Sequence, residues 1–278
     1  MFKLLNAIIL GGLIIFNMST IFPDHRLKDV QSYKIYYSNV DEAILKDMAG
    51  FDMMIVESLQ FTKAEVDSVK NSGDTLMIGY ISVMEIGEWD NGIRDLILPA
   101  DLLETRYKKL KRVHNGLIVG DITQSHYQDV LLDMIETRIV NNGMDGIFLD
   151  TVDQLEHYDY DLDVKTELHE GYRTFLIKLR ERYPEFIVIQ NRGFKSLYDF
   201  SYEYIDGFLW EDFDTVDQRK GSVWKMLRLN ILRVMKGFDV LTSSYENEKE
   251  NLKTSNLFGW KHTQVISEDD YMKWRFEK

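Results

Sequence analysis

The chain has 278 residues, of which 45% are hydrophobic. A chain of this length can bury roughly 75% of its unfolded surface, which excludes a disordered protein. It contains no cysteine, so disulfides, thiolate metal sites and cysteine nucleophiles are excluded. The formal net charge of −13 disfavours nucleic acid as a partner and favours a cationic one.

The N-terminus has the composition of a targeting segment. Lys3 precedes an apolar run at residues 4–16, which is shorter than the about 20 residues of a membrane-spanning helix. No small-x-small cleavage pattern follows the run. An uncleaved signal anchor and a buried N-terminal helix therefore remain alternatives to a secretory signal. We expect residues 1–23 to be a signal peptide or signal anchor. Residues 24–278 are expected to form an exported domain, secreted or held at the membrane by residues 4–16.

Apolar segments alternate with amphipathic ones from residue 33 onward. Most apolar segments are continuously hydrophobic, which indicates strands covered on both faces. Thr62 and Glu65 are spaced as a helix capping box. The predicted strands are residues 33–38, 51–58, 75–83, 116–121, 145–150, 185–191, 206–211, 238–244 and 261–267. The predicted helices are residues 41–49, 62–73, 128–143, 164–184 and 223–237.

This alternation, without a Pro/Gly/Ser-rich linker, predicts one α/β domain with a parallel sheet. Nine candidate strands over about 250 residues fit a (β/α)8 (TIM) barrel, with residues 116–121 as a strand within a loop. The alternative is a doubly wound open sheet. No G-x-G-x-x-G pattern follows any predicted strand, so nucleotide binding has no support.

Carboxylates follow several of the predicted strands. Reactive side chains of barrel enzymes lie at the C-terminal ends of strands, so these acids are expected at one rim. Asp150 and Glu211 end fully apolar segments, which favours a functional role for both. The other polar side chains expected at this rim are those of Glu57, Tyr80, Ser82, Glu85, Asp121, Gln190 and Asn191. Two carboxyl groups facing one another suit glycosidic bond cleavage, in which one protonates the leaving oxygen and the other attacks or activates water.

Each of these residues also has a structural interpretation. Asp121 and Asp153 can cap or solvate the segments that follow them. Aromatic residues near the rim can stack on sugar rings or pack within the barrel top; they are Tyr37, Tyr80, Trp89, Trp210 and Phe213.

Two other patterns lack support. Residues 159–170 place acids at calcium-loop positions, but Val164 stands where the loop requires glycine, so we expect an acidic loop leading into a helix. The six histidines have no metal-ligand spacing and no serine lies in a G-x-S-x-G elbow, so neither a metal nor a serine triad is expected.

The ordered motifs YKIYYSNVD, FDMMIVES, IGYISVMEIGEWD, MDGIFLDTVD, IVIQNRGF and IDGFLWEDF resemble glycoside hydrolase family 114, the endo-α-1,4-polygalactosaminidase-like proteins. The resemblance extends from about residue 33 to the C-terminus. Its most specific parts are GYIS-x-x-E at residues 79–85 and DGIFLDTVD at residues 145–153. The family typically has a small residue where Met84 stands, a difference that concerns the neighbouring subsite.

The resemblance implies a (β/α)8 barrel, without cofactor, that hydrolyses an α-1,4-linked galactosamine-containing exopolysaccharide. It implies Asp150 as the nucleophile and Glu211 as the general acid/base of a retaining mechanism. Partly deacetylated polygalactosamine is cationic, and Glu57, Glu85 and Asp121 are the candidates for binding its ammonium groups. The remaining candidate substrate contacts are Tyr37, Tyr80, Ser82, Asn191 and Trp210.

Two other functions remain open at the level of sequence. One is a carbohydrate-binding barrel of an exopolysaccharide system that has lost turnover, since a fold alone does not establish activity. The other is a glycosidase of different specificity on the same scaffold, for example toward a neutral galactan.

Overall fold

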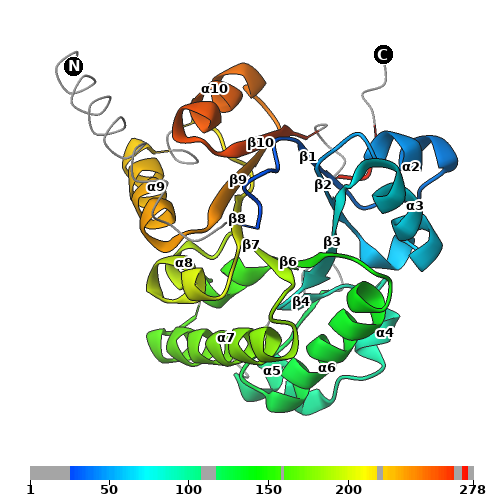
Figure 1. Cartoon of the computed structure of the whole chain (residues 1–278). Helices are drawn as coiled ribbons and strands as arrows, with labels where there is room; N and C mark the ends of the chain where they lie inside the picture. The colour runs from blue at the N-terminus through cyan, green and yellow to red at the C-terminus, as the bar shows by residue number, and fades with distance from the viewer. Residues whose placement is uncertain (1–25, 108–116, 158–159, 218–221, 266–270, 275–278) are drawn as a thin grey trace.

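The computed structural model describes residues 26–107, 117–157, 160–217, 222–265 and 271–274. Eight strands pair in parallel, each with the next, to form a nearly closed barrel (Figure 1). The predicted TIM barrel is therefore confirmed, and the open doubly wound sheet is wrong. The strands are β1 (Tyr33–Tyr36), β2 (Met53–Val56), β3 (Leu76–Ser82), β6 (Gly146–Asp150), β7 (Ile187–Asn191), β8 (Gly207–Trp210), β9 (Asp239–Ser244) and β10 (Lys261–Gln264).

Helices follow the strands and surround the barrel (Figure 1). The five predicted helices are present, and the Thr62–Glu65 capping box forms at the start of α3. Four described helices were missed: α8, which is short, α10, which is largely polar, and the four-residue helices α4 and α5. The helices are α2 (Glu42–Met48), α3 (Lys63–Gly73), α6 (Ser125–Ile135), α7 (Leu162–Arg182), α8 (Phe194–Asp199), α9 (Val223–Lys236) and α10 (Glu248–Phe258), and a π-helical turn, Glu136–Val140, extends α6.

The predicted loop strand lies outside the barrel. β5 (Ile118–Val119) pairs antiparallel with β4 (Glu85–Ile86), and both belong to the insertion between β3 and α6. The short helices α4 (Asn91–Arg94) and α5 (Leu103–Arg106) lie in the same insertion. The assignment of residues 116–121 to a loop strand is therefore confirmed.

Side-chain alternation divides the core into two layers. Ile55, Phe148 and Leu209 lie in the cluster inside the barrel, whereas Val56 and Leu149 pack between the barrel and the helices. Successive residues of a strand point to opposite faces. This alternation decides which residues beyond each strand end point into the barrel mouth.

The segment before β1 crosses the centre of the barrel, as the dark-blue trace of Figure 1 shows. Leu27 is fully buried, and its Cδ1 would lie 2.9 Å from a Cβ built on Gly207, at the start of β8. Arg26 donates to the carbonyl oxygens of Pro184 and Phe186, just before β7. The chain therefore enters at the N-terminal end of the barrel, opposite the predicted active-site rim.

The predicted signal or anchor, residues 1–23, lies outside the described residues. Among the helices that the structure describes, none is long and apolar enough to cross a membrane. α7 begins at Leu162 with Val164 buried against the core. The acidic segment at residues 159–170, expected to be a loop leading into a helix, is therefore helical from Leu162 onward.

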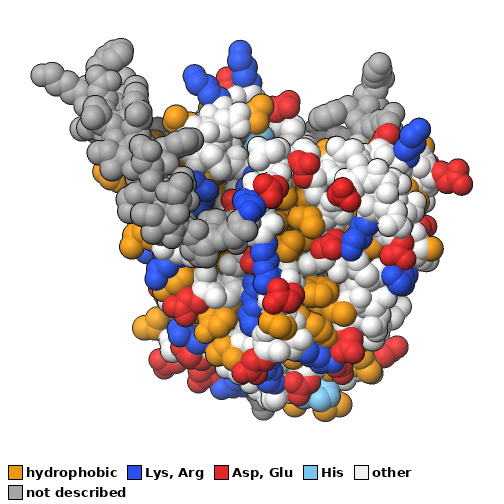
Figure 2. Space-filling model, in the orientation of Figure 1, with side chains coloured by type: hydrophobic (Ala, Val, Ile, Leu, Met, Phe, Trp, Pro, Cys, Tyr) orange, Lys and Arg blue, Asp and Glu red, His pale blue; other side chains and the backbone are white. Residues whose placement is uncertain are grey.

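Charged side chains of both signs are mixed over the face in view in Figure 2, where Lys and Arg alternate with Asp and Glu. Nucleic-acid binding relies on clustered cations that neutralise phosphates. The arrangement on this face offers no continuous surface of that kind.

Candidate active site

Five of the predicted rim residues point into the mouth of the barrel by strand alternation. Tyr37 and Tyr80 are two residues beyond the interior positions Ile35 and Ile78, and Asp150 is two beyond Phe148. Asn191 and Glu211 follow the interior residues Ile189 and Leu209 at the same spacing. Since parallel strands share one direction, all five side chains gather at the C-terminal rim.

One amide nitrogen joins the two candidate catalytic carboxylates. Asn191 Nδ2 donates to Asp150 Oδ1 at 2.7 Å and to Glu211 Oε2 at 3.0 Å. Those two oxygens can be no farther apart than the sum of the two hydrogen-bond distances, 5.7 Å. They lie about 5 Å apart if the two N–H bonds of the amide diverge by about 120°. A separation of about 5–5.5 Å is typical of retaining glycosidases.

The surroundings of Asp150 disfavour its ionised form. Burial, followed by the negative charge of Glu211, raises its pKa to about 6. Hydrogen bonds from the Asn191 amide, the Thr151 backbone and the Tyr80 hydroxyl act in the opposite direction because they stabilise the carboxylate. With a pKa of about 6, Asp150 is mostly ionised at neutral pH, as a nucleophile must be.

Glu211 is held on both oxygens. The Tyr271 hydroxyl donates to Oε1 at 2.8 Å, while Asn191 donates to Oε2. Arg192 Nε lies 3.8 Å from Oε2, and the same side chain pairs with Asp153 at 3.4 Å. The carboxyl group therefore has a fixed orientation beside Asp150.

A cavity of about 130 Å³ opens next to Asp150. Two predicted ligands for ammonium groups, Glu57 and Glu85, line it, and Trp89 stands at its edge with 70% of its surface exposed. Burial raises the pKa of Glu57. Arg138 and Asp90 also line the cavity and form a two-pronged ion pair with each other.

Ser82 and Tyr80 also line the cavity. The Ser82 hydroxyl lies 2.9 Å from that of Thr151, whose oxygen also accepts the backbone N–H of Met84 at 2.9 Å. Met84 itself is fully buried and does not contribute to the cavity lining. The departure from the family pattern at this residue therefore concerns the core packing and not the cavity surface.

Trp210 is not at the rim, so its assignment as a substrate contact is wrong. It has the opposite alternation to Leu209 and Glu211 and packs outside the barrel, with its ring 5.0 Å from Phe194 and 5.1 Å from Phe213. It is 3% exposed. Phe213 is fully buried in the same aromatic cluster.

The structure does not bring Asp121 to the cavity. Asp121 is fully buried, and its carboxylate accepts hydrogen bonds from the Thr123 backbone and hydroxyl and from Gln124. Arg106 lies 3.7 Å away. These contacts fit the capping interpretation, in which Asp121 orders the turn that leads into α6.

Three site residues were not found in the sequence: Thr151, Arg192 and Tyr271. All three have positive φ angles, 61°, 52° and 68°, as does Asp212 after Glu211 at 54°. Such backbone conformations are uncommon for residues other than glycine, and they cluster at functional sites. No sequence signal indicates them, because these residue types disfavour the left-handed region.

Within the described ranges, no group of three or more acidic or histidine side chains is arranged to hold a metal ion. The rim presents two carboxyl groups about 5 Å apart, with the cavity of about 130 Å³ beside one of them.

A family model for glycoside-hydrolase family GH114 matches residues 23–269. The chain belongs to the GH114 family. This GH114 barrel is accordingly a glycoside hydrolase, and the predicted family is confirmed. A search of curated protein sequences finds no significant match.

Two solved structures share the fold of this GH114 chain. The glycoside hydrolase domain of PelA from Pseudomonas aeruginosa superposes with a TM-score of 0.68 at 19% identity, covering 84% of this chain and 94% of that one. Aspergillus fumigatus Ega3, solved in complex with galactosamine, has a TM-score of 0.62 at 12% identity, covering 88% and 95%.

Proposed function

We propose that this glycoside hydrolase is exported and cleaves α-1,4-linked galactosamine-containing polysaccharide by a retaining mechanism. The observation that carries the proposal is the Asn191 amide, which holds Asp150 and Glu211 at the separation that retention requires. Galactosamine is the ligand named for the structurally similar Ega3, which supports this sugar as the substrate unit. Export is supported by Lys3 and the apolar run at residues 4–16.

In the first step, an Asp150 oxygen forms a bond to the anomeric carbon while the bond to the glycosidic oxygen breaks. Glu211, protonated at this stage, transfers its proton to that leaving oxygen. In the second step, Glu211 takes a proton from water, the water oxygen bonds to the anomeric carbon, and the ester to Asp150 breaks. The second step returns to Glu211 the proton that it lost in the first and frees the Asp150 carboxylate, so the enzyme ends unchanged.

The acidic cavity suits a protonated amino sugar. Glu57 and Glu85 line it beside Asp150, and a partly desolvated carboxylate attracts an ammonium group more strongly than one in water. The formal net charge of −13 would also attract a cationic polymer at low ionic strength.

A panel of polymers tests the substrate. Partly deacetylated polygalactosamine is expected to be shortened, whereas fully N-acetylated polygalactosamine and a neutral galactan of similar length are expected to be cleaved slowly or not at all. Fragment sizes by mass spectrometry give the result. Equal cleavage of the neutral galactan would contradict the amino-sugar specificity, and binding without cleavage of any polymer would indicate a non-catalytic barrel.

Activity is expected to depend on pH through Asp150. Because the nucleophile must be ionised and its pKa is raised to about 6, kcat/KM should fall as the pH drops through 6. Tyr80→Phe removes a hydrogen bond that stabilises the carboxylate, so the same decline should begin at higher pH. The profiles of the two proteins, measured from pH 4 to 8, provide the check. An unshifted acid limb in the variant would contradict this role of Asp150.

Trp89 and Trp210 should respond in opposite ways to replacement by alanine. Trp89→Ala is expected to raise KM about 3- to 10-fold with an unchanged melting temperature, because the exposed ring is available to stack on a sugar or its ammonium group. Trp210→Ala is expected to cost about 3–5 kcal/mol of unfolding free energy, because it empties a buried aromatic cluster. Thermal melting and steady-state kinetics of both variants distinguish the roles. A lower melting temperature for Trp89→Ala with an unchanged KM would show that its ring only packs.

A further inference from the structure

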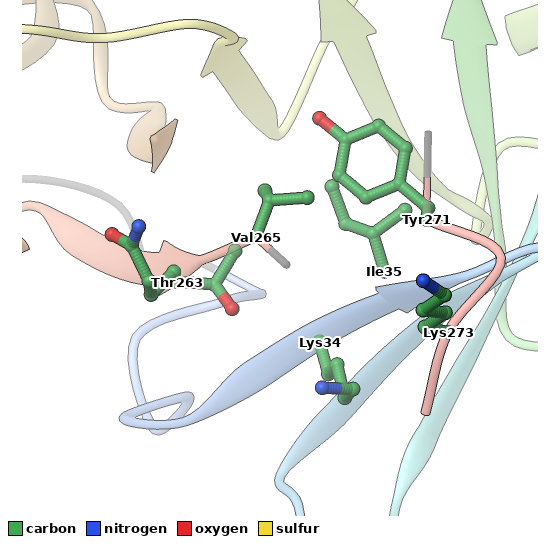
Figure 3. Close-up of a pocket in the computed structure, with 7 residues that line it drawn as sticks. Lys34, Ile35, Thr263, Val265, Tyr271 and Lys273 are labelled. Carbon is green, nitrogen blue, oxygen red and sulfur yellow. The ribbon is translucent and has the colours of Figure 1, made fainter. Parts of the chain in front are cut away.

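The barrel has a seam between its first and last strands. β1 and β10 are the two end strands of the sheet, and they lie against each other. In the described residues, the backbone hydrogen bonds that pair all other neighbouring strands of the barrel do not pair these two. Figure 3 shows this seam, with Thr263 and Val265 on one side and Ile35 on the other. Tyr271 stands over Ile35 and lines the pocket at this seam.

The segment at residues 271–274 reaches the seam from beyond β10 and is anchored at both ends. The Tyr37 N–H donates to the Tyr271 carbonyl oxygen at 3.0 Å. Trp274 packs edge-to-face on Tyr36 at 5.3 Å, and its indole N–H donates to Asp47 of α2 at 3.1 Å. These contacts attach the segment to the first β/α unit of the barrel.

Tyr271 points from this segment into the catalytic mouth. Its hydroxyl donates to Glu211 Oε1 at 2.8 Å and lies 3.1 Å from the Ser243 hydroxyl. Its ring packs against Tyr37 at 5.3 Å, and the residue is 8% exposed. The backbone of Tyr271 has a φ of 68°, a conformation that an aromatic residue adopts only where surrounding contacts hold it.

We propose that Tyr271, carried by the segment at residues 271–274 beside the barrel seam, is a positioning residue that orients the Glu211 carboxyl group for proton transfer. The proposal rests on the proposed function of Glu211 as the general acid/base. Asn191 holds Oε2 from one side and Tyr271 holds Oε1 from the other, so the carboxyl plane is fixed by two donors on separate elements. Without the Tyr271 hydroxyl, the contacts of Asn191 and Arg192 hold only Oε2, and Oε1 can rotate about them.

This role predicts a dependence on the leaving group. A natural sugar leaving group needs a proton from Glu211, whereas dinitrophenolate leaves without one. Tyr271→Phe keeps the ring and removes only the hydroxyl. It should lower kcat for a galactosamine oligosaccharide about 10- to 100-fold, as expected for a lost hydrogen bond to a charged group. The 2,4-dinitrophenyl glycoside of the same oligosaccharide should be cleaved, in its first step, at nearly the wild-type rate.

The ratio of the two rates in one preparation is the measurement, because it is independent of the fraction of folded enzyme. Tyr36→Phe is the matched control: its hydroxyl donates to the backbone carbonyl of Asn39, and its ring lies on the same Trp274. A ratio that changes in Tyr271→Phe and not in Tyr36→Phe supports the positioning role. An unchanged ratio in Tyr271→Phe, whether the rates fall together or stay the same, overturns it. The parent function is tested separately: full activity of Asp150→Asn would remove the proposed function, whereas an inactive Asp150→Asn with an unchanged ratio in Tyr271→Phe removes only this inference.

Discussion

Asp150→Asn is expected to lower hydrolysis of partly deacetylated polygalactosamine at least about 1,000-fold while the protein remains folded. The amide is nearly the same size as the carboxylate and can still accept the hydrogen bond from Asn191. It cannot form the ester with the anomeric carbon. Release of reducing ends, measured at equal folded enzyme concentration, gives the size of the loss.

The same substitution should stabilise the protein at neutral pH. The pKa of Asp150 is raised from an ordinary 3.8 to about 6, so the fold disfavours its ionised form. Below about pH 4 the carboxyl group is protonated in both the folded and the unfolded protein and does not affect the free energy of unfolding. Between about pH 4 and 6 it increasingly destabilises the folded protein, and above about pH 6 this destabilisation is constant at about 3 kcal/mol. Asp150→Asn should therefore melt above wild type at pH 7 and equally at pH 3.5.

Asp129→Asn is the control for both effects. Asp129 is an exposed carboxylate on α6 that pairs with Lys178 of α7, and both helices lie outside the barrel (Figure 1). It should change neither the rate nor the pH dependence of melting. An active Asp150→Asn would exclude Asp150 as the nucleophile. Inactivity accompanied by a large loss of stability at pH 7 would contradict the electrostatic cost assigned to its carboxylate.

Glu211→Gln is expected to lower turnover of the natural polymer by about 100- to 10,000-fold, the usual contribution of a general acid. A dinitrophenyl glycoside should still form the ester with Asp150, because its leaving group needs no proton. Azide, a small anionic nucleophile that needs no general base, should then release the sugar as a glycosyl azide of the substrate's own anomeric configuration. Product identification by NMR is the measurement.

Glu57→Gln provides the comparison within the same cavity. Glu57 is proposed to bind an ammonium group, so its replacement should raise KM for the polymer without making turnover respond to azide. If azide had no effect on Glu211→Gln and both classes of substrate declined equally, Glu211 would not be the acid/base. Removing the Glu211 charge should also lower the pKa of Asp150, since that charge is the second cause of its elevation.

The barrel and the convergence of Asp150 and Glu211 could be predicted because both depend on local patterns. Continuous apolar strands, helices between them and a carboxylate after each of two strands are visible along the chain. The alternation that turns Asp150 and Glu211 inward could also have excluded Trp210. Adjacent residues of one strand point to opposite faces, so Trp210 and Glu211 cannot both reach the mouth.

Other parts of the site depend on tertiary contacts that no local pattern encodes. Tyr271 reaches Glu211 only because residues 271–274 lie against the first β/α unit, where Trp274 packs on Tyr36. The double hydrogen bond of Asn191 requires three neighbouring strands in register. For Asp121, capping and substrate binding have the same sequence signature, a carboxylate after an apolar segment, and only its burial separates them.

The stereochemistry of the first product tests the convergence of Asp150 and Glu211 on one glycosidic bond most directly. Polygalactosamine is incubated with the enzyme in an NMR tube, and the anomeric signals of new reducing ends are followed before mutarotation. The separation set by Asn191 predicts that α-anomeric ends appear first and β-anomeric ends follow only by mutarotation. Initial formation of β-anomeric ends would contradict a nucleophilic Asp150.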